Sequence, residues 1–262
     1  MTKAQRDELI RLITSPPAGS KIAAAKDFGV DLTLLVGMLE LTPTERLLKL
    51  AAAQALVHEL QAAKKAGGGK QKAGSAEVGP RSEFELILKI LWYAGVRFVM
   101  VGDLALAAYG RFPATLLLEL CYDLDGDNVK RLAKTLEPFH PRLRGVPANL
   151  PFCFDAATVA SGMNFTLTTD IGEIDVFGEV TGIGGYKEAK ALSITLVLFG
   201  LECAVLSLDG LIQAKRAAAR PKDLLVLPEM EALREMETRA KRQSGPAEAL
   251  NKSRVEDKQS ET

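Results

Sequence analysis

The stretch RFVMVGDLALAAYGRFPATLLLELCYD, residues 97–123, constrains the fold more than any other part of the chain. An apolar run ends at Gly102, an alanine- and leucine-rich segment follows, and a second apolar run reaches Cys121. The two runs have the length and composition of buried strands, and the segment between them has those of a short helix. The order of strand, glycine turn, helix and strand predicts a mixed α/β or α+β fold.

Composition shifts along the chain predict four parts. Residues 1–63 show the apolar spacing of helices and predict a helical module. Residues 64–82 are rich in Gly, Lys, Ala and Ser and predict a flexible linker. Residues 83–240 mix strand and helix patterns and form the predicted main domain, a mixed sheet flanked by helices. Residues 241–262 are polar and predict a disordered tail.

The helical module contains a pattern similar to a helix-turn-helix, but it lacks the side chains that read DNA. Its second helix, residues 31–40, has no Arg, Lys, Asn or Gln to contact base edges. We therefore expect a helical hairpin that packs on a protein partner or on the rest of the chain.

The totals limit the classes of partner. Lys+Arg and Asp+Glu are balanced at 33 each, which argues against a large basic surface for nucleic acid. The N-terminus is charged, and no apolar run approaches the roughly 20 residues of a membrane span, so we expect no signal peptide and no membrane contact. Three widely spaced cysteines in apolar contexts predict reduced thiols and a cytoplasmic protein.

Residues 97–123 also have the layout of a site for phosphoryl transfer. Backbone N–H groups at a helix start bind phosphate oxygens, and the helix dipole favours the negative charge there. Acids at positions i and i+2 of a strand point to the same face, which suits shared binding of Mg²⁺. A third acid on a neighbouring strand would complete such a site.

These pieces resemble the minimal nucleotidyltransferases of the superfamily related to DNA polymerase beta, in particular the bacterial toxin–antitoxin and abortive-infection type. The resemblance covers about Phe84 to Leu233. It rests on FVMVGDLALAAYGR, ATLLLELCYD, PFHPRLRG, FTLTTDIGEIDVFGEV and LSLDGLIQAKRAAARPKDL. It implies Mg²⁺-dependent transfer of a nucleotide from an NTP to a tRNA, other RNA or protein acceptor, with release of pyrophosphate.

The resemblance assigns roles to positions of this chain. The family's glycine pair falls at Gly102 and Asp103, and its Asp-x-Asp pair falls at Leu117 and Glu119. The third acid falls at Asp175. Glu119 and Asp175 are then the catalytic acids and the metal ligands, and Gly102 and Asp103 lie at the nucleotide.

Two basic residues join the nucleotide site in the same way. Arg111 keeps the first arginine of the family's turn between helix and strand, and the second falls at Pro113. Lys215 belongs to an intact framework piece and is assigned to the nucleotide as well. An alternative for Lys215 is that it binds carboxylates within the fold. Glu119 could likewise open onto a polar cleft or pair with Arg111.

The departures from the family pattern leave two hypotheses. Leu117 cannot bind a metal, Asp103 repels phosphates, and Pro113 removes a cation, so Mg²⁺ binding and catalysis are expected to be weak or lost. The first hypothesis is an enzyme that works with Glu119 and Asp175. The second is a non-catalytic binding or regulatory protein, either a pseudoenzyme or a partner in a system of toxin–antitoxin type.

Overall fold

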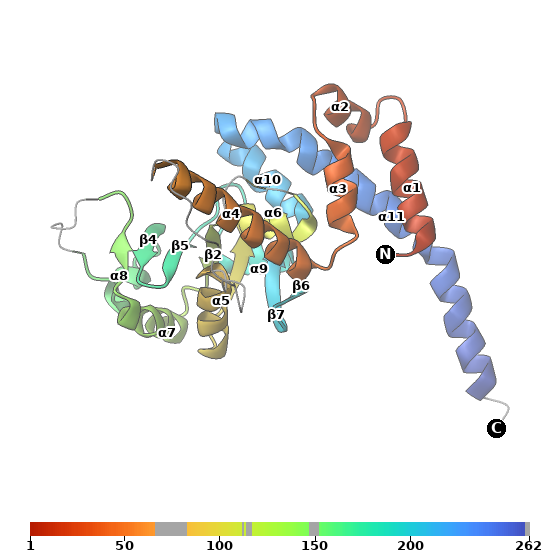
Figure 1. The fold of residues 1–262 in the computed structure, drawn as a ribbon. Coiled ribbons are helices and arrows are strands. Elements are labelled where there is room, and N and C mark those ends of the chain that lie inside the picture. Colours follow the sequence, from red (N-terminus) through yellow and green to blue (C-terminus); the bar gives the residue numbers. More distant parts are fainter. Residues whose placement is uncertain (66–82, 112, 114–116, 147–151, 260–262) are drawn as a thin grey trace. The chain divides into compact units, whose positions relative to one another are not determined.

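The chain forms two compact units. A computed structural model describes residues 1–65, 83–111, 113, 117–146 and 152–259. The helical unit combines Met1–Leu41 with Arg220–Thr262, and the sheet unit is Thr42–Ala219. The two ends of the chain therefore belong to one unit, and the sheet is formed from the middle (Figure 1).

The helical unit is held together by one apolar core. Its helices are α1 (Lys3–Thr14), α2 (Lys21–Asp27), α3 (Leu32–Leu39) and α11 (Pro221–Gln259). The core contains Leu9, Leu12, Ile22, Ala25, Leu32, Leu35, Val36, Ala232 and Met236. Three residues of α3 belong to it, so the segment with a weak similarity to a recognition helix serves packing here.

A carboxylate from α11 caps the start of α2. The backbone N–H groups of Lys21 and Ile22 donate to Glu235 Oε2 at 2.7 and 3.2 Å. The first N–H groups of a helix have no partner inside it, and they favour negative charge. This contact joins residues more than 200 positions apart in the sequence.

The limits of the two units differ from the predicted boundaries at 63 and 240. Helix α4 (Pro43–Lys65) packs against α6 and β6 of the sheet unit, where buried Arg46 donates to the carbonyl of Ala108 at 2.6 Å. Residues 220–240 pack with the N-terminal helices instead of the sheet. Most of the predicted linker, from residue 66 on, lies outside the described residues. Helix α11 continues to Gln259, across the predicted disordered tail.

The sheet unit confirms the predicted mixed α/β class. Its strands are β1 (Phe98–Val101), β2 (Leu118–Tyr122), β3 (Arg142–Leu143), β4 (Phe165–Thr169), β5 (Gly172–Phe177), β6 (Ser193–Leu198) and β7 (Leu201–Leu206). In the described residues these seven strands form one sheet in the order β3-β4-β5-β2-β1-β7-β6. The pairs β2–β5 and β1–β7 are parallel, and the other pairs are antiparallel.

Helices pack on the central strands of this sheet. Those of the sheet unit besides α4 are α5 (Glu83–Tyr93), α6 (Gly102–Tyr109), α7 (Gly126–Leu136), α8 (Ala156–Ala160), α9 (Tyr186–Ala191) and α10 (Leu208–Ala218), and a 3₁₀ turn spans Glu137–Phe139. Helices α6 and α9 contact β1 and β2, and α5 contacts β5. None of the described helices combines the length and the hydropathy that a membrane crossing requires.

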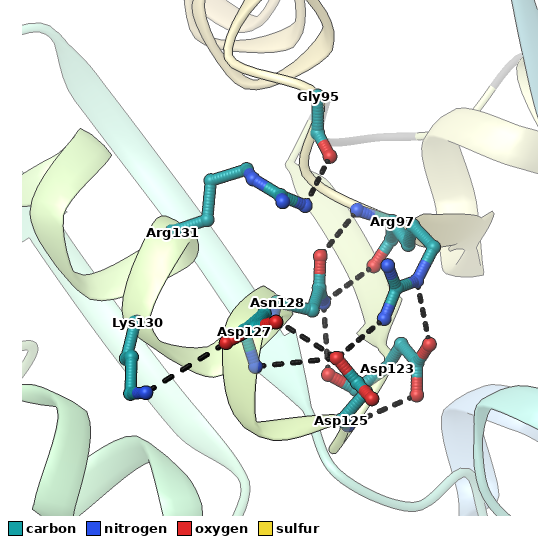
Figure 2. Close-up of polar contacts among 8 residues, drawn as sticks. All are labelled: Gly95, Arg97, Asp123, Asp125, Asp127, Asn128, Lys130 and Arg131. Atoms are coloured by element: carbon teal, nitrogen blue, oxygen red, sulfur yellow. Dashed lines mark hydrogen bonds and ion pairs between the residues drawn. The ribbon is translucent and has the colours of Figure 1, made fainter.

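A polar network fixes the ends of β1 and β2 that lie beside α7 (Figure 2). Arg97, just before β1, pairs with Asp123 at 2.7 Å and with Asp125 at 2.8 Å. Fully buried Asn128 accepts the N–H of Arg97 at 2.6 Å and donates to the carbonyls of Arg97 and Asp123 at 3.1 and 2.8 Å. One side chain thus satisfies three backbone groups where two strands and a helix meet.

We expect Asn128→Ala to destabilise the sheet unit by about 2–4 kcal/mol, because it removes three hydrogen bonds to part-buried backbone groups. Urea unfolding followed by the fluorescence of Trp92, the single tryptophan of the chain, measures the effect. Asp127→Ala is the matched control, since the Asp127 side chain is 81% exposed. Equal stability of the two variants would contradict this role of Asn128.

Candidate functional site

The candidate site lies where β1 ends and α6 begins. Val101 at the N-cap position of α6 makes no side-chain cap hydrogen bond, so the first N–H groups of the helix need another acceptor. The antiparallel register sets Val101 opposite Glu119 of β2. Glu119 Oε2 accepts the backbone N–H of Asp103 at 2.8 Å. The start of α6 is therefore capped by a carboxylate from the neighbouring strand.

Gly102 is required by this contact. Its φ of +68° lies in the left-handed region, which residues other than glycine rarely adopt. A Cβ atom at this position would lie 1.7 Å from Glu119 Oε2 and 2.2 Å from its carboxyl carbon. A glycine thus allows the carboxylate to approach the backbone where the family pattern brings the backbone close to a triphosphate.

Asp103 and Lys215, both predicted at the nucleotide, form an ion pair with each other. Lys215 Nζ of α10 lies 3.0 Å from Asp103 Oδ1, and the two side chains are 14% and 30% exposed. Asp103 also adds negative charge to the first turn of α6, where the helix dipole favours it. This contact is the alternative considered for Lys215, in which it binds a carboxylate within the fold.

Burial raises the pKa of Glu119 from 4.5 to about 7. Loss of hydration is the largest cause, because an ionised carboxyl is poorly solvated among apolar neighbours. The N–H of Asp103 and the charge of Lys215 lower the pKa, whereas the charges of Asp103 and Asp175 raise it. Near neutral pH, Glu119 is therefore divided between its charged and neutral forms.

Asp175 lies beside Glu119 but has its own cationic partner. The parallel register of β2 and β5 sets the two acids directly opposite each other. Asp175 is buried, and Arg144 Nη2 lies 2.5 Å from its Oδ1. Arg144 also contacts Glu173, at 3.0 Å. Sequence reasoning included Arg144 in the piece PFHPRLRG without giving it a role.

The contact of Arg144 with Asp175 is only weakly predictable from the sequence. The backbone N–H of Arg144 donates to the carbonyl of Thr166 on β4, and Thr166 pairs with Asp175 in the sheet. Arg144 directly follows β3, and its guanidinium reaches across β4 to Asp175 on β5. Two arginines at i and i+2, Arg142 and Arg144, share one face of an extended segment, and this spacing is the available hint.

The remaining predicted residues lie at the margins of the site. Arg111 follows Gly110, the residue that ends α6, so the helix separates it from Gly102 by about 12 Å of axial rise. Leu117 directly precedes β2 and is partly buried. Pro113 is buried. The structure thus brings Gly102 and Glu119 together with their neighbours Asp103, Lys215 and Asp175, and it leaves Arg111 at the far end of α6.

The acids present do not fit a pair of catalytic Mg²⁺ ions. Such sites use several carboxylate oxygens that are held open toward the metals. Here Glu119 accepts a backbone N–H and has a pKa near neutrality, and Asp175 is paired with Arg144. Over the described ranges, no three His, Cys, Asp or Glu side chains are grouped so as to hold a metal ion.

We expect Gly102→Ala to destabilise the sheet unit by about 2–4 kcal/mol, because it adds a clash with Glu119 to the strain of a positive φ. In a Glu119→Ala background the cost should fall to roughly 1–2 kcal/mol, which is the strain alone. Gly200→Ala is the matched control, since Gly200 has a φ of +81° and nothing within 4 Å of a Cβ. Equal costs of Gly102→Ala in both backgrounds would show that Glu119 does not approach Gly102.

We expect Glu119→Gln to be more stable than the parent above pH 7. The folded pKa of Glu119 lies above its unfolded value of 4.5, so the folded state holds a proton that the unfolded state loses between these values. Stability from this group is complete below 4.5 and falls as pH rises toward 7, by roughly 3 kcal/mol in total. Glutamine keeps an acceptor for Asp103 and has no charge.

Urea unfolding at a series of pH values, followed by Trp92 fluorescence, measures this difference. The parent should lose stability relative to Glu119→Gln between pH 4.5 and 7. Glu202→Gln, at an exposed position of β7, should leave the pH profile of the parent unchanged. Parallel profiles for Glu119→Gln and the parent would contradict a raised pKa at Glu119.

Comparison of the chain with protein-family models, with curated proteins and with solved structures finds no match. The similarity to minimal nucleotidyltransferases thus depends on the motifs themselves and stays a prediction.

Proposed function

We propose that the chain is a non-catalytic binding or regulatory protein built on a nucleotidyltransferase-like frame. The observation that carries the proposal is the hydrogen bond from the Asp103 N–H to the Glu119 carboxylate at the start of α6. In the family pattern this helix start faces a triphosphate. Here an internal anion takes the place of a phosphate oxygen, so an incoming nucleotide has to displace it.

Charge at the same helix start opposes a nucleotide as well. Asp103 lies in the first turn of α6, and its pairing with Lys215 engages the cation that the resemblance assigns to the phosphates. The net charge of the Asp103–Lys215 pair is close to zero, and ionised Glu119 adds a negative charge at the same helix start. Each tenfold loss of affinity corresponds to about 1.4 kcal/mol, so a repulsion of that size would weaken nucleotide binding about tenfold.

The acids that the resemblance assigns to catalysis are engaged within the fold. Leu117 supplies no metal ligand, and Asp175 is satisfied by Arg144. Transition-state stabilisation by bound metals typically contributes several kcal/mol, and each 1.4 kcal/mol is about tenfold in rate. A chain without these ligands in open positions loses most of that contribution.

One observation favours the alternative, residual nucleotide transfer. Parallel strands β2 and β5 set Glu119 directly opposite Asp175, and the charge of Asp175 contributes to the raised pKa of Glu119. Two adjacent carboxyl groups on neighbouring strands would hold a metal if Arg144 moved away and Glu119 released Asp103. The experiment below separates the two functions.

We expect the parent chain to transfer at least a hundredfold less nucleotide than a variant with the family residues restored. The restored variant carries Asp103→Gly, Pro113→Arg, Leu117→Asp and Glu119→Asp. Both proteins are incubated with radiolabelled NTPs, Mg²⁺ or Mn²⁺, and bulk tRNA or a cell lysate. Labelled acceptor is then measured on gels.

A matched control adds Asp175→Asn to the restored variant, which should abolish its labelling. Labelling by the parent at the rate of the restored variant would contradict the proposal and would favour catalysis by Glu119 and Asp175. Absence of labelling in the restored variant would contradict the nucleotidyltransferase-like frame itself. Tighter binding of ATP by Glu119→Ala than by the parent, measured by calorimetry, would support displacement of an internal anion.

A further inference from the structure

Strand β5 carries a pair of acids with the spacing that the sequence analysis looked for on β2. Glu173 and Asp175 are two residues apart on β5, so their side chains point to the same face of the sheet. The parallel register of β2 and β5 sets Glu119 opposite Asp175 on that face. Two acids at i and i+2 of a strand suit shared binding of one cation, and here β5 supplies them.

Glu173 lies across the ladder from the position to which the resemblance to nucleotidyltransferases assigns its first acid. The register sets Leu118 opposite Ile174, and the same register continued by one residue sets Leu117 opposite Glu173. The acid that is missing at Leu117 is therefore matched by an acid on the neighbouring strand. What these carboxylates are bonded to, and not only their number, decides whether they can hold a metal ion.

One guanidinium holds both acids of β5. Arg144 Nη1 lies 3.0 Å from Glu173 Oε2, and Arg144 Nη2 lies 2.5 Å from Asp175 Oδ1. The planar fork of the guanidinium gives one nitrogen to each carboxylate, which fixes its orientation between them. The side chains of Asp175 and Arg144 are 8% and 25% exposed, so salt and water screen this pair less than a surface pair.

The register of the sheet sets this guanidinium in place. The N–H of Arg144 donates to the carbonyl of Thr166 at 2.9 Å, and Thr166 pairs with Asp175. Arg144, Thr166 and Asp175 therefore form a row across the edge of the sheet, and the short side chain of Thr166 lies between the two charged ones. The row brings the cation over β4 to the acids of β5.

We propose that Arg144 is a built-in cation that takes the place of a divalent metal ion at Glu173 and Asp175 and excludes the metal from them. A divalent ion would need the carboxylate oxygens that the guanidinium already engages. An arginine in a protein keeps its charge at every physiological pH and cannot leave the chain, so the exclusion is permanent. The inference rests on the proposed function and deepens it by naming the group that closes the site to metal.

Titration with Mn²⁺ alone tests the proposal, with the electron paramagnetic resonance signal of free Mn²⁺ as the readout. Arg144→Met removes the charge and frees the carboxylate oxygens that the guanidinium engages. We expect this variant to bind Mn²⁺ more tightly than the parent by about tenfold or more. Adding Asp175→Asn to Arg144→Met should remove the gained binding, which locates it at β5.

Arg142→Met is the matched control. Arg142 lies two residues before Arg144 and loses the same charge, but its side chain is 61% exposed and contacts Asp170 instead of the acids of β5. It should bind Mn²⁺ like the parent. Equal Mn²⁺ affinity of Arg144→Met and Arg142→Met would overturn the proposal.

Unfolding in urea, followed by Trp92 fluorescence, shows whether each variant is folded and gives a second readout. Mn²⁺ at about 1 mM should raise the urea midpoint of Arg144→Met and leave that of Arg142→Met unchanged, because only a ligand of the folded state stabilises it. Arg144→Gln, which keeps an N–H donor for Asp175 without the charge, is a second variant and should show the same gain. Absence of the gain in both folded Arg144 variants would overturn the proposal.

The parent provides a test that depends on no arginine variant. Micromolar binding of Mn²⁺ by the parent that Asp175→Asn abolishes would overturn the proposal, because the guanidinium would then not exclude the metal. Such a parent that still labels no acceptor would leave the proposed function standing. The metal titration and the nucleotide-transfer assay can therefore fail separately.

Discussion

One hydrogen bond, from the Asp103 N–H to the Glu119 carboxylate, organises the candidate site. It requires a glycine at position 102, because any side chain there would overlap the carboxyl group. Burial of the Glu119 carboxyl at this contact raises its pKa to about 7, although the Asp103 N–H itself lowers the pKa. The hydrogen bond also occupies the helix start that the resemblance to nucleotidyltransferases assigns to a phosphate. Because of this contact, the N–H of Asp103 at the start of α6 is bonded within the protein and is not open to a ligand.

The sheet makes that contact possible by fixing registers at both ends of its central strands. At one end, antiparallel pairing of β1 with β2 sets Val101 opposite Glu119, and parallel pairing of β2 with β5 adds Asp175. At the other end, buried Asn128 ties β1 and β2 to the start of α7. A shift of one residue in β2 would move every side chain to the opposite face and dissolve the site.

The sequence predicted the parts of the fold that depend on local patterns. The strand, glycine turn, helix and strand of residues 97–123 follow from apolar runs and a turn residue, and the structure has them. Partners distant in sequence could not be predicted in the same way. The contact of Arg144 with Asp175 spans 31 residues and depends on the pairing of β3 with β4. Joining of α11 to the N-terminal helices depends on which apolar faces meet, and no local pattern specifies that.

The most direct test of the central claim is a crystal structure of the full chain grown with saturating ATP and Mg²⁺. We predict electron density for the Glu119 carboxylate at hydrogen-bonding distance from the Asp103 N–H, with no phosphate at the start of α6. A triphosphate bound to that helix start, with Glu119 turned away from Gly102, would contradict the claim and would favour the nucleotide site that the resemblance implies.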